Sequence, residues 1–84
     1  MSNESILLRV LQGTADSNIR FRDLEALPIE LGFSERIKGS HHIFTRPDVA
    51  EILNLQPLRS LAKAYQVKQV RKVIVQYKLA EGTE

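Results

Sequence analysis

The chain has 84 residues, a net charge of +2, 43% hydrophobic residues and no cysteine. This length fits one small domain, and the lack of cysteine excludes disulfides, thiolate metal sites and thiol nucleophiles. The N-terminal segment has no basic flank or cleavage site of a signal peptide, and no segment approaches the roughly 20 apolar residues of a membrane span. We therefore expect a cytoplasmic protein with a single domain over residues 1–84.

Apolar residues recur at helical spacing near the start of the chain. They follow Ser2 and Asn3, either of which is a suitable cap, and Gly13 comes directly after them. The stripe consists of Ile6, Leu7, Val10 and Leu11. This pattern predicts a short N-terminal helix.

A second helix is predicted from the apolar positions of RFRDLEALPIEL, with Gly32 as its C-terminal signal. These positions are Phe21, Leu24, Leu27 and Leu31. Pro28 lies within the pattern, where it lacks a backbone donor and clashes with the preceding turn. We therefore expect this second helix to be kinked or interrupted.

The segments FSERIK and HHIFTR flank the dipeptide Gly39-Ser40. Their aromatic and β-branched residues and their two-residue connection predict a β-hairpin, and glycine in the first position suits a type II′ turn. A third strand is predicted at EILNLQ, where Leu53 and Leu55 share one face and Ile52, Asn54 and Gln56 share the other.

The last helix is predicted from Tyr65 to Leu79, where apolar residues form one wide stripe opposite Lys68, Arg71 and Lys72. The stripe consists of Val67, Val70, Val73, Ile74 and Tyr77. The order helix, helix, three antiparallel strands, helix predicts an α+β fold with helices packed on one face of a small sheet.

Charge is distributed unevenly along these elements. Residues 1–37 carry a net charge of −2, whereas residues 38–80 carry +6. A basic half is the arrangement that a polyanion binder needs. Charge alone favours the simpler interpretation, a solvated basic face.

Two adjacent histidines, His41 and His42, begin the second strand of the predicted hairpin. Neighbouring side chains on a strand point to opposite faces, so we expect at most one of them to be a principal catalytic group. The same geometry argues against shared metal coordination, and the chain offers no third histidine. For either ring alone, a structural role in the hairpin is the competing interpretation.

Phosphodiester chemistry fits these residue types. An imidazole with an unperturbed pKa of about 6.5 can take a proton from a ribose 2′-hydroxyl at neutral pH. Lys38 and the backbone N–H groups near Gly39 could hold the phosphate. A serine nucleophile at Ser40 is disfavoured because no orienting acid is evident and because sequence neighbours rarely form such a triad.

Four segments in this order resemble the HicA family of toxin-antitoxin ribonucleases, in the branch with an extra N-terminal helix. The segments are LGF, KGSHHIFTRP, EILNLQP and AYQVKQVRKVIVQYKL. The resemblance covers residues 20–80 and leaves residues 1–19 as an N-terminal helical extension. It implies a fold like a double-stranded RNA-binding domain, with a three-stranded antiparallel sheet packed against helices.

The resemblance also implies a function. Members of this family are metal-independent endoribonucleases that cleave mRNA and inhibit translation, and a HicB-like antitoxin neutralises them by covering the active-site face. The catalytic histidine of the family corresponds to His41, with His42 as the next candidate, and the glycine and hydroxyl of the motif correspond to Gly39 and Ser40.

The predicted RNA-binding residues combine the hairpin with the basic residues of the C-terminal half. They are Lys38, Gly39, Ser40, Arg46, Lys68, Arg71 and Lys72. No cofactor or metal is expected. Two alternatives stay open: a non-catalytic RNA-binding module that recognises the phosphate backbone by shape, and an inactive protein that serves mainly to bind its partner.

Overall fold

The computed structural model of the chain describes residues 3–82, which form helices and strands in the predicted order. The elements are α1 (Asn3–Gln12), η1 (Asp16–Asn18), α2 (Phe21–Glu30), β1 (Ser34–Lys38), β2 (His41–Arg46), β3 (Val49–Leu55), α3 (Ala64–Gln76) and η2 (Leu79–Gly82). Within this range no helix is both long and apolar enough to span a membrane. Ser2, one of the two expected caps of α1, lies outside the described residues.

The three strands form one antiparallel sheet in the order β1-β2-β3. Lys38 pairs with His41 across the β1-β2 turn, which therefore has two residues. The φ angle is positive at Gly39 (62°) and not at Ser40, as a type II′ turn requires. The predicted hairpin and its glycine are thus confirmed.

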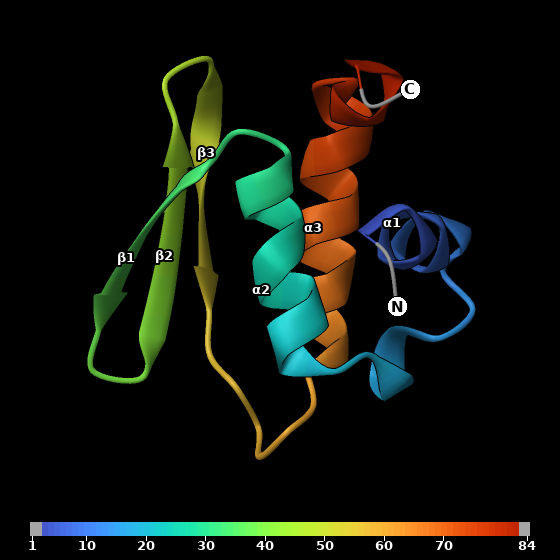
Figure 1. Ribbon diagram of the computed structural model, residues 1–84, viewed down its shortest axis with the longest axis vertical. Helices are drawn as coiled ribbons and strands as arrows, with labels where there is room; N and C mark the ends of the chain where they lie inside the picture. Colours follow the sequence, from blue (N-terminus) through green and yellow to red (C-terminus); the bar gives the residue numbers. More distant parts are fainter. Residues whose placement is uncertain (1–2, 83–84) are drawn as a thin grey trace.

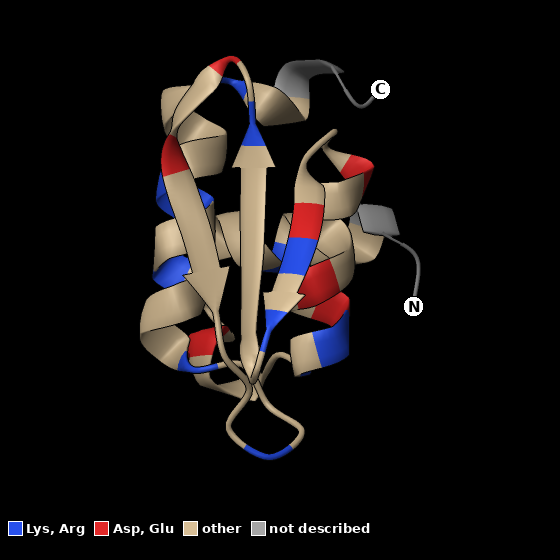
Figure 2. Cartoon of the chain, turned by 90° about the vertical axis from the view of Figure 1, so that its left-hand side faces the viewer, with Lys and Arg blue, Asp and Glu red and all other residues tan. Residues whose placement is uncertain are grey.

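Helices α1, α2 and α3 lie on one side of the sheet, which confirms the α+β architecture. Figure 1 shows α2 and α3 against the sheet, with α1 beyond them on the side away from the strands. Alternate residues of the strands, such as Phe44 and Leu53, are buried beneath these helices. Figure 2 shows the other face of the sheet, which no helix covers.

Helix α2 is continuous, so the interruption expected at Pro28 is not observed. The proline lies in the last turn, where only one intrahelical hydrogen bond is lost. Its own carbonyl accepts hydrogen bonds from the N–H groups of Leu31 (3.0 Å) and Phe33 (2.9 Å). Gly32 follows with a φ of 93°, as expected of a C-terminal glycine.

Two elements differ from the predictions by two or more residues at one end. Strand β3 begins at Val49, two residues before the predicted segment, because Val49 pairs with Arg46 beyond an irregularity in the β2-β3 register. Helix α3 ends at Gln76 rather than at Leu79. Lys78 has a left-handed backbone (φ 53°), which a helix cannot contain.

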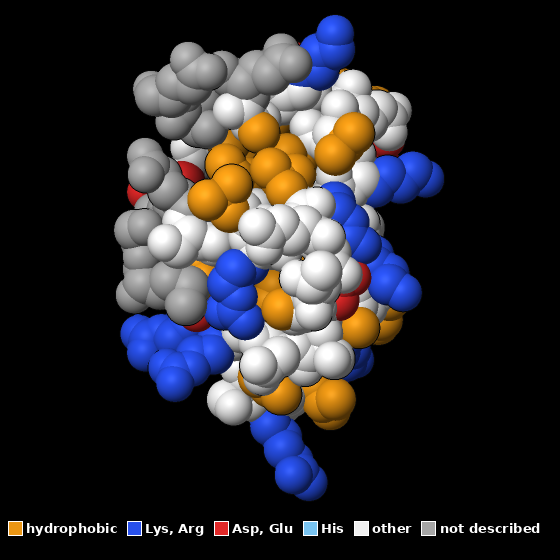
Figure 3. Space-filling model, turned by 90° about the vertical axis from the view of Figure 1, so that its right-hand side faces the viewer, with side chains coloured by type: hydrophobic (Ala, Val, Ile, Leu, Met, Phe, Trp, Pro, Cys, Tyr) orange, Lys and Arg blue, Asp and Glu red, His pale blue; other side chains and the backbone are white. Residues whose placement is uncertain are grey.

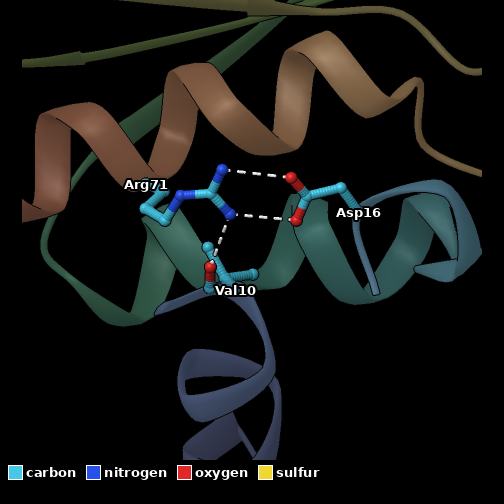
Figure 4. A network of polar contacts seen from close by, with 3 residues as sticks. All are labelled: Val10, Asp16 and Arg71. Atoms are coloured by element: carbon cyan, nitrogen blue, oxygen red, sulfur yellow. Dashed lines mark hydrogen bonds and ion pairs between the residues drawn. The ribbon is translucent and has the colours of Figure 1, made fainter. Parts of the chain in front are cut away.

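An ion pair fastens α3 to the N-terminal part of the chain (Figure 4). Arg71 donates two hydrogen bonds to the carboxylate of Asp16, at 2.9 and 3.0 Å, and a third to the carbonyl of Val10 at 3.0 Å. The hydrogen bond from Arg71 lowers the pKa of Asp16. This bidentate geometry is the strong form of an arginine–carboxylate contact, so we assign Arg71 a role in stability.

The segment between β3 and α3 is held at the same end of the molecule as the hairpin turn (Figure 1). The N–H of Phe21 donates to the carbonyl of Ser60 at 2.9 Å, and the N–H of Ala62 donates to the carbonyl of Ile19 at 2.8 Å. The first turns of α2 and α3 are therefore brought beside this loop. This end of the fold, which we call the hairpin end, carries both histidines.

Candidate functional site

His41 lies on the uncovered face of the sheet and is exposed. Its Nδ1 is 3.1 Å from Oδ1 of Asn54 on β3. An amide oxygen can only accept, so Nδ1 carries the proton and the neutral ring keeps its acceptor at Nε2. Nε2 has no hydrogen-bond partner among the described residues. The result is an oriented imidazole whose basic nitrogen is accessible.

A small pocket of about 210 Å³ opens beside His41. Its lining combines the ends of two strands with the first turns of α3: His41, Asn54, Gln56, Tyr65, Gln66 and Gln69. The Nε2 of Gln56 donates to the hydroxyl of Ser40 at 2.9 Å, which joins the hairpin turn to this pocket. We call it the amide pocket, because most of its lining residues carry amides.

His42 points to the opposite face, beneath α2, as the alternation along a strand predicts. Its side chain is 16% exposed, and Nδ1 lies 2.8 Å from Oε2 of Glu35 and 2.9 Å from Oε2 of Glu25. The ring also meets Phe21 edge to face, with centroids 4.9 Å apart. Carboxylates and an aromatic ring therefore fix His42 inside the fold.

The two carboxyl groups beside His42 have opposite pKa shifts. The hydrogen bond with Glu35, together with burial and the negative charge of Glu35, raises the pKa of Glu25. For Glu35 burial acts to raise the pKa, but the hydrogen bonds with Glu25 and His42 outweigh it and the pKa is lowered. As pH falls, Glu25 is therefore the first of the two carboxyl groups to take up a proton.

The ligand atoms of His42, Glu25 and Glu35 all lie within 4.8 Å of one another, so this group could hold a cation. Glu25 lies in α2 and Glu35 in β1, so the pattern of the two adjacent histidines gives no sign of this group. His41 points away from the group, so the two histidines cannot share an ion.

A larger pocket of about 510 Å³ opens above His42. Three arginines, Arg20, Arg22 and Arg59, line it together with His42 and Glu25. These arginines are not among the predicted site residues, because Arg20 and Arg22 belong to the acidic half of the chain. They meet Arg59 only through the contact between the 56–63 loop and the start of α2, which no local pattern predicts.

The predicted RNA-binding residues separate into two groups. Lys38, Lys68 and Lys72 are exposed, as are Gly39 and Ser40 in the turn. Arg46 instead forms an ion pair with Asp48 at 2.8 Å and donates to the carbonyl of Leu31 at 2.7 Å. Arg46 and Arg71 are therefore engaged within the fold, and the exposed lysines are the predicted cations that remain accessible.

The side of the molecule formed by α1 and α3 has a different character. Figure 3 shows hydrophobic side chains gathered in its upper half, with cations beside and below them and no histidine visible. Figure 2 shows cations at the hairpin end, on the loop and near the turn. The candidate site thus lies at the hairpin end.

No family model, no curated protein and no solved structure matches the chain. The candidate site therefore rests on the residues and geometry described above.

Proposed function

We propose that the chain is a metal-independent endoribonuclease in which His41 is the general base. The observation that carries the proposal is the exposed ring of His41, with Nδ1 held by Asn54 and Nε2 open beside the amide pocket. This is the arrangement of a base that must accept a proton from a bound ligand. The resemblance to HicA toxins, based on the KGSHHIFTRP segment, implies the same reaction on mRNA.

In this reaction Nε2 of His41 takes the proton of a ribose 2′-hydroxyl. The 2′ oxygen attacks the adjacent phosphorus, and the bond from phosphorus to the 5′ oxygen breaks. The products are a 2′,3′-cyclic phosphate and a 5′-hydroxyl, whose proton comes from solvent. Lys38 pairs with His41 across the hairpin, so its charge can stabilise the negative charge that develops on the phosphate.

His42 is less suited to this role. Its Nδ1 lies between two carboxyl groups, and its side chain is 16% exposed. An RNA phosphate at this ring would meet the negative charge of Glu35. We therefore assign His42 a structural part in the proposed enzyme and His41 the chemical step.

Cations around the hairpin end provide a path for the RNA backbone. Arg20, Arg22 and Arg59 line the pocket above His42, and Lys38 lies at the turn. Guanidinium groups bind phosphate through two parallel hydrogen bonds, which suits a strand that passes this pocket. Contacts of this kind give affinity without sequence preference.

The resemblance also implies a protein partner, a HicB-like antitoxin. Exposed Ile52 lies two residues from Asn54 on the same face of β3, and exposed Tyr65 lines the amide pocket. Apolar side chains beside a polar site are typical of a surface that a protein covers. An antitoxin on this face would block access to His41, as required for a toxin of a type II toxin-antitoxin system in the cytoplasm.

One observation favours a second candidate, a non-catalytic RNA-binding module in a fold like a double-stranded RNA-binding domain. Among the described residues His41 is the single histidine that lines the amide pocket, so no second imidazole is available there as a proton donor. A module of this kind would bind RNA with a steep dependence on salt and leave it intact.

Incubation of the purified chain with a defined single-stranded RNA in EDTA tests the proposal. We expect cleavage with 2′,3′-cyclic phosphate ends, and no cleavage where a single 2′-deoxynucleotide replaces the nucleotide at the cleavage site. Binding without cleavage over hours would favour the RNA-binding module. RNA that is neither bound nor cleaved would contradict both.

A further inference from the structure

Three arginines line the pocket above His42, and none of them has a partner within the fold. Arg20, Arg22 and Arg59 are exposed, and their side chains form no ion pair or hydrogen bond with the described residues. Like charges around one cavity repel one another, and a bound anion would remove that repulsion. We call this cavity the arginine pocket. Its lining consists of Arg20, Phe21, Arg22, Glu25, His42, Pro57, Arg59 and Ser60.

Arg59 lies in a tight turn of the loop that projects beyond the strands at the hairpin end (Figure 1). Leu58 and Leu61 exchange two backbone hydrogen bonds, at 3.1 and 3.2 Å. Arg59 and Ser60 between them therefore form a two-residue turn. The φ angle is positive at Arg59 (60°) and not at Ser60, as in a type II′ turn. The turn between β1 and β2 is of the same type and has Gly39 in the equivalent position.

An arginine in this position strains the backbone. The first central position of a type II′ turn favours glycine, because a Cβ crowds the backbone at positive φ. Among the described residues the other non-glycine residue with positive φ is Lys78, which follows the end of α3, where a left-handed residue is common. Strained residues of this kind gather at ligand-binding segments. The strain at Arg59 therefore indicates that its guanidinium serves binding and not the stability of the turn.

We propose that the arginine pocket binds the terminal phosphate of an RNA strand, and that the strained turn holds Arg59 in place as a clamp on this phosphate. With Glu25 ionised and His42 neutral, the lining has a net charge of +2. A terminal phosphate carries a charge of about −1.5 to −2 at pH 7 and has three acceptor oxygens. A phosphate within a strand carries a single charge and has two free oxygens. The terminal group is therefore the better match in charge and in acceptors.

The shape of the pocket also suits the end of a strand. Its volume of about 510 Å³ lies within the range of roughly 300–1,000 Å³ for pockets that enclose a ligand. Guanidinium groups bind the oxygens of an enclosed phosphate in pairs. His42 lines the pocket, and the neighbouring His41 lies on the opposite face of the sheet. A strand that ends in the pocket would therefore cross the hairpin end to reach His41.

This inference rests on the proposed function for its biological meaning, because it makes RNA with a terminal phosphate the preferred substrate of His41. Binding can nevertheless be measured without cleavage, by calorimetric titration with 2′-O-methyl RNA, which lacks the attacking hydroxyl. The probes have one sequence and carry a phosphate at the 5′ end, a phosphate at the 3′ end, or a hydroxyl at both ends. We expect one phosphorylated probe to bind about tenfold more tightly than the hydroxyl probe. The comparison of the two phosphorylated probes shows which end the pocket takes.

Two variants and a control assign this preference to the pocket. Arg59→Gly keeps the turn, relieves its strain and removes the guanidinium. We expect an unchanged or higher melting temperature and a preference of about twofold or less. Arg22→Gln should reduce the preference about threefold or more without a change in the backbone. Arg36→Gln removes an exposed arginine of β1 outside the pocket and is the matched control, in which the preference should remain.

Equal binding of the three probes, or a preference that survives in both Arg59→Gly and Arg22→Gln, would overturn the inference. A lower melting temperature of Arg59→Gly would contradict the strain in the turn and the clamp built on it. Cleavage of unmodified RNA by the same proteins separates the two proposals. A preference for phosphorylated ends without cleavage would refute the nuclease and leave the phosphate site. Cleavage together with equal binding of the three probes would refute the phosphate site and leave the nuclease.

Discussion

His41 and His42 are neighbours in the sequence and occupy opposite environments in the fold. His41 is exposed and has one neutral partner, Asn54, whereas His42 is enclosed by two carboxyl groups and an aromatic ring. The difference follows from the alternation of side chains along β2. We therefore propose separate roles for the two histidines, the chemical step for His41 at the surface and a structural role for His42 inside the fold. The following variants test these two roles.

The largest effect on stability is expected for His42→Ala. The change leaves Glu25 and Glu35 without their shared partner and opens a space against Phe21. We expect a loss of about 2–4 kcal/mol in the free energy of unfolding, because the partly buried carboxyl groups lose a hydrogen-bond partner and the removed ring leaves a space. Urea denaturation gives the number. The free energy of unfolding of His41→Ala should stay within about 0.5 kcal/mol of the wild type, since the His41 ring is exposed. Equal losses of stability in the two variants would contradict the structural role assigned to His42 alone.

A similar contrast is expected between two cations of α3. Arg71 and Asp16 have side-chain exposures of 24% and 12%, and Arg71 donates three hydrogen bonds to Asp16 and Val10. Arg71→Ala should therefore cost about 1–3 kcal/mol. Lys72 is exposed, and Lys72→Ala should change stability by less than about 0.5 kcal/mol. Thermal unfolding of both variants checks this. Equal melting temperatures of the two variants would show that the hydrogen bonds of Arg71 do not contribute to stability.

Charge reversal at the hairpin turn tests the proposed binding of RNA at the hairpin end. Lys38→Glu places a negative charge opposite His41, so RNA affinity should fall, and the slope of log affinity against log salt should decrease by about one unit. The measurement is RNA binding at several salt concentrations. Lys78→Glu, at an exposed lysine after α3, is the control. An equal loss of RNA affinity in this variant would mean that the net charge of the protein, and not a cation at the hairpin end, determines binding.

The smallest effects are pH dependences around His42. The pKa of Glu25 is raised above its ordinary value of 4.5, so its contribution to stability is complete below that pH and is lost as pH rises through the folded pKa. The pKa of Glu35 is lowered, so its contribution is present above pH 4.5 and is lost as pH falls through the folded pKa.

Glu25→Gln and Glu35→Gln should therefore have opposite slopes relative to the wild type. As pH rises from about 3 to 7, the Glu25→Gln variant should gain stability relative to the wild type and the Glu35→Gln variant should lose it. Denaturant midpoints across this range give the comparison. Slopes of the same sign would contradict the opposite pKa shifts of the two carboxyl groups.

Local patterns were sufficient for most of the fold. Helical spacing predicted α1, α2 and α3, and Gly39-Ser40 predicted the hairpin turn, because glycine permits the left-handed backbone found there. The sequence predicted a kink or an interruption at Pro28, and the helix is not interrupted there. The proline lies in the last turn, where it removes only one intrahelical hydrogen bond. The likeness to a double-stranded RNA-binding domain stays a prediction.

The candidate site was predictable only where it is local. The two histidines and their opposite faces follow from the sequence of one strand. The arginine pocket, the carboxyl pair at His42 and the amide pocket each join segments distant in the chain, which patterns within one segment cannot predict. Arg71 illustrates the same limit, because its helical position indicated an exposed cation and its partner Asp16 lies 55 residues away.

The central claim is that His41 performs the chemistry and His42 supports the fold, and one experiment tests it most directly. His41→Gln and His42→Gln would be compared with the wild type for cleavage of a defined single-stranded RNA in EDTA, at a temperature where all three are folded. We predict that His41→Gln lowers the cleavage rate about 10²- to 10⁴-fold and that His42→Gln stays within about tenfold of the wild type. Full activity of His41→Gln, with loss of activity in His42→Gln, would contradict the account.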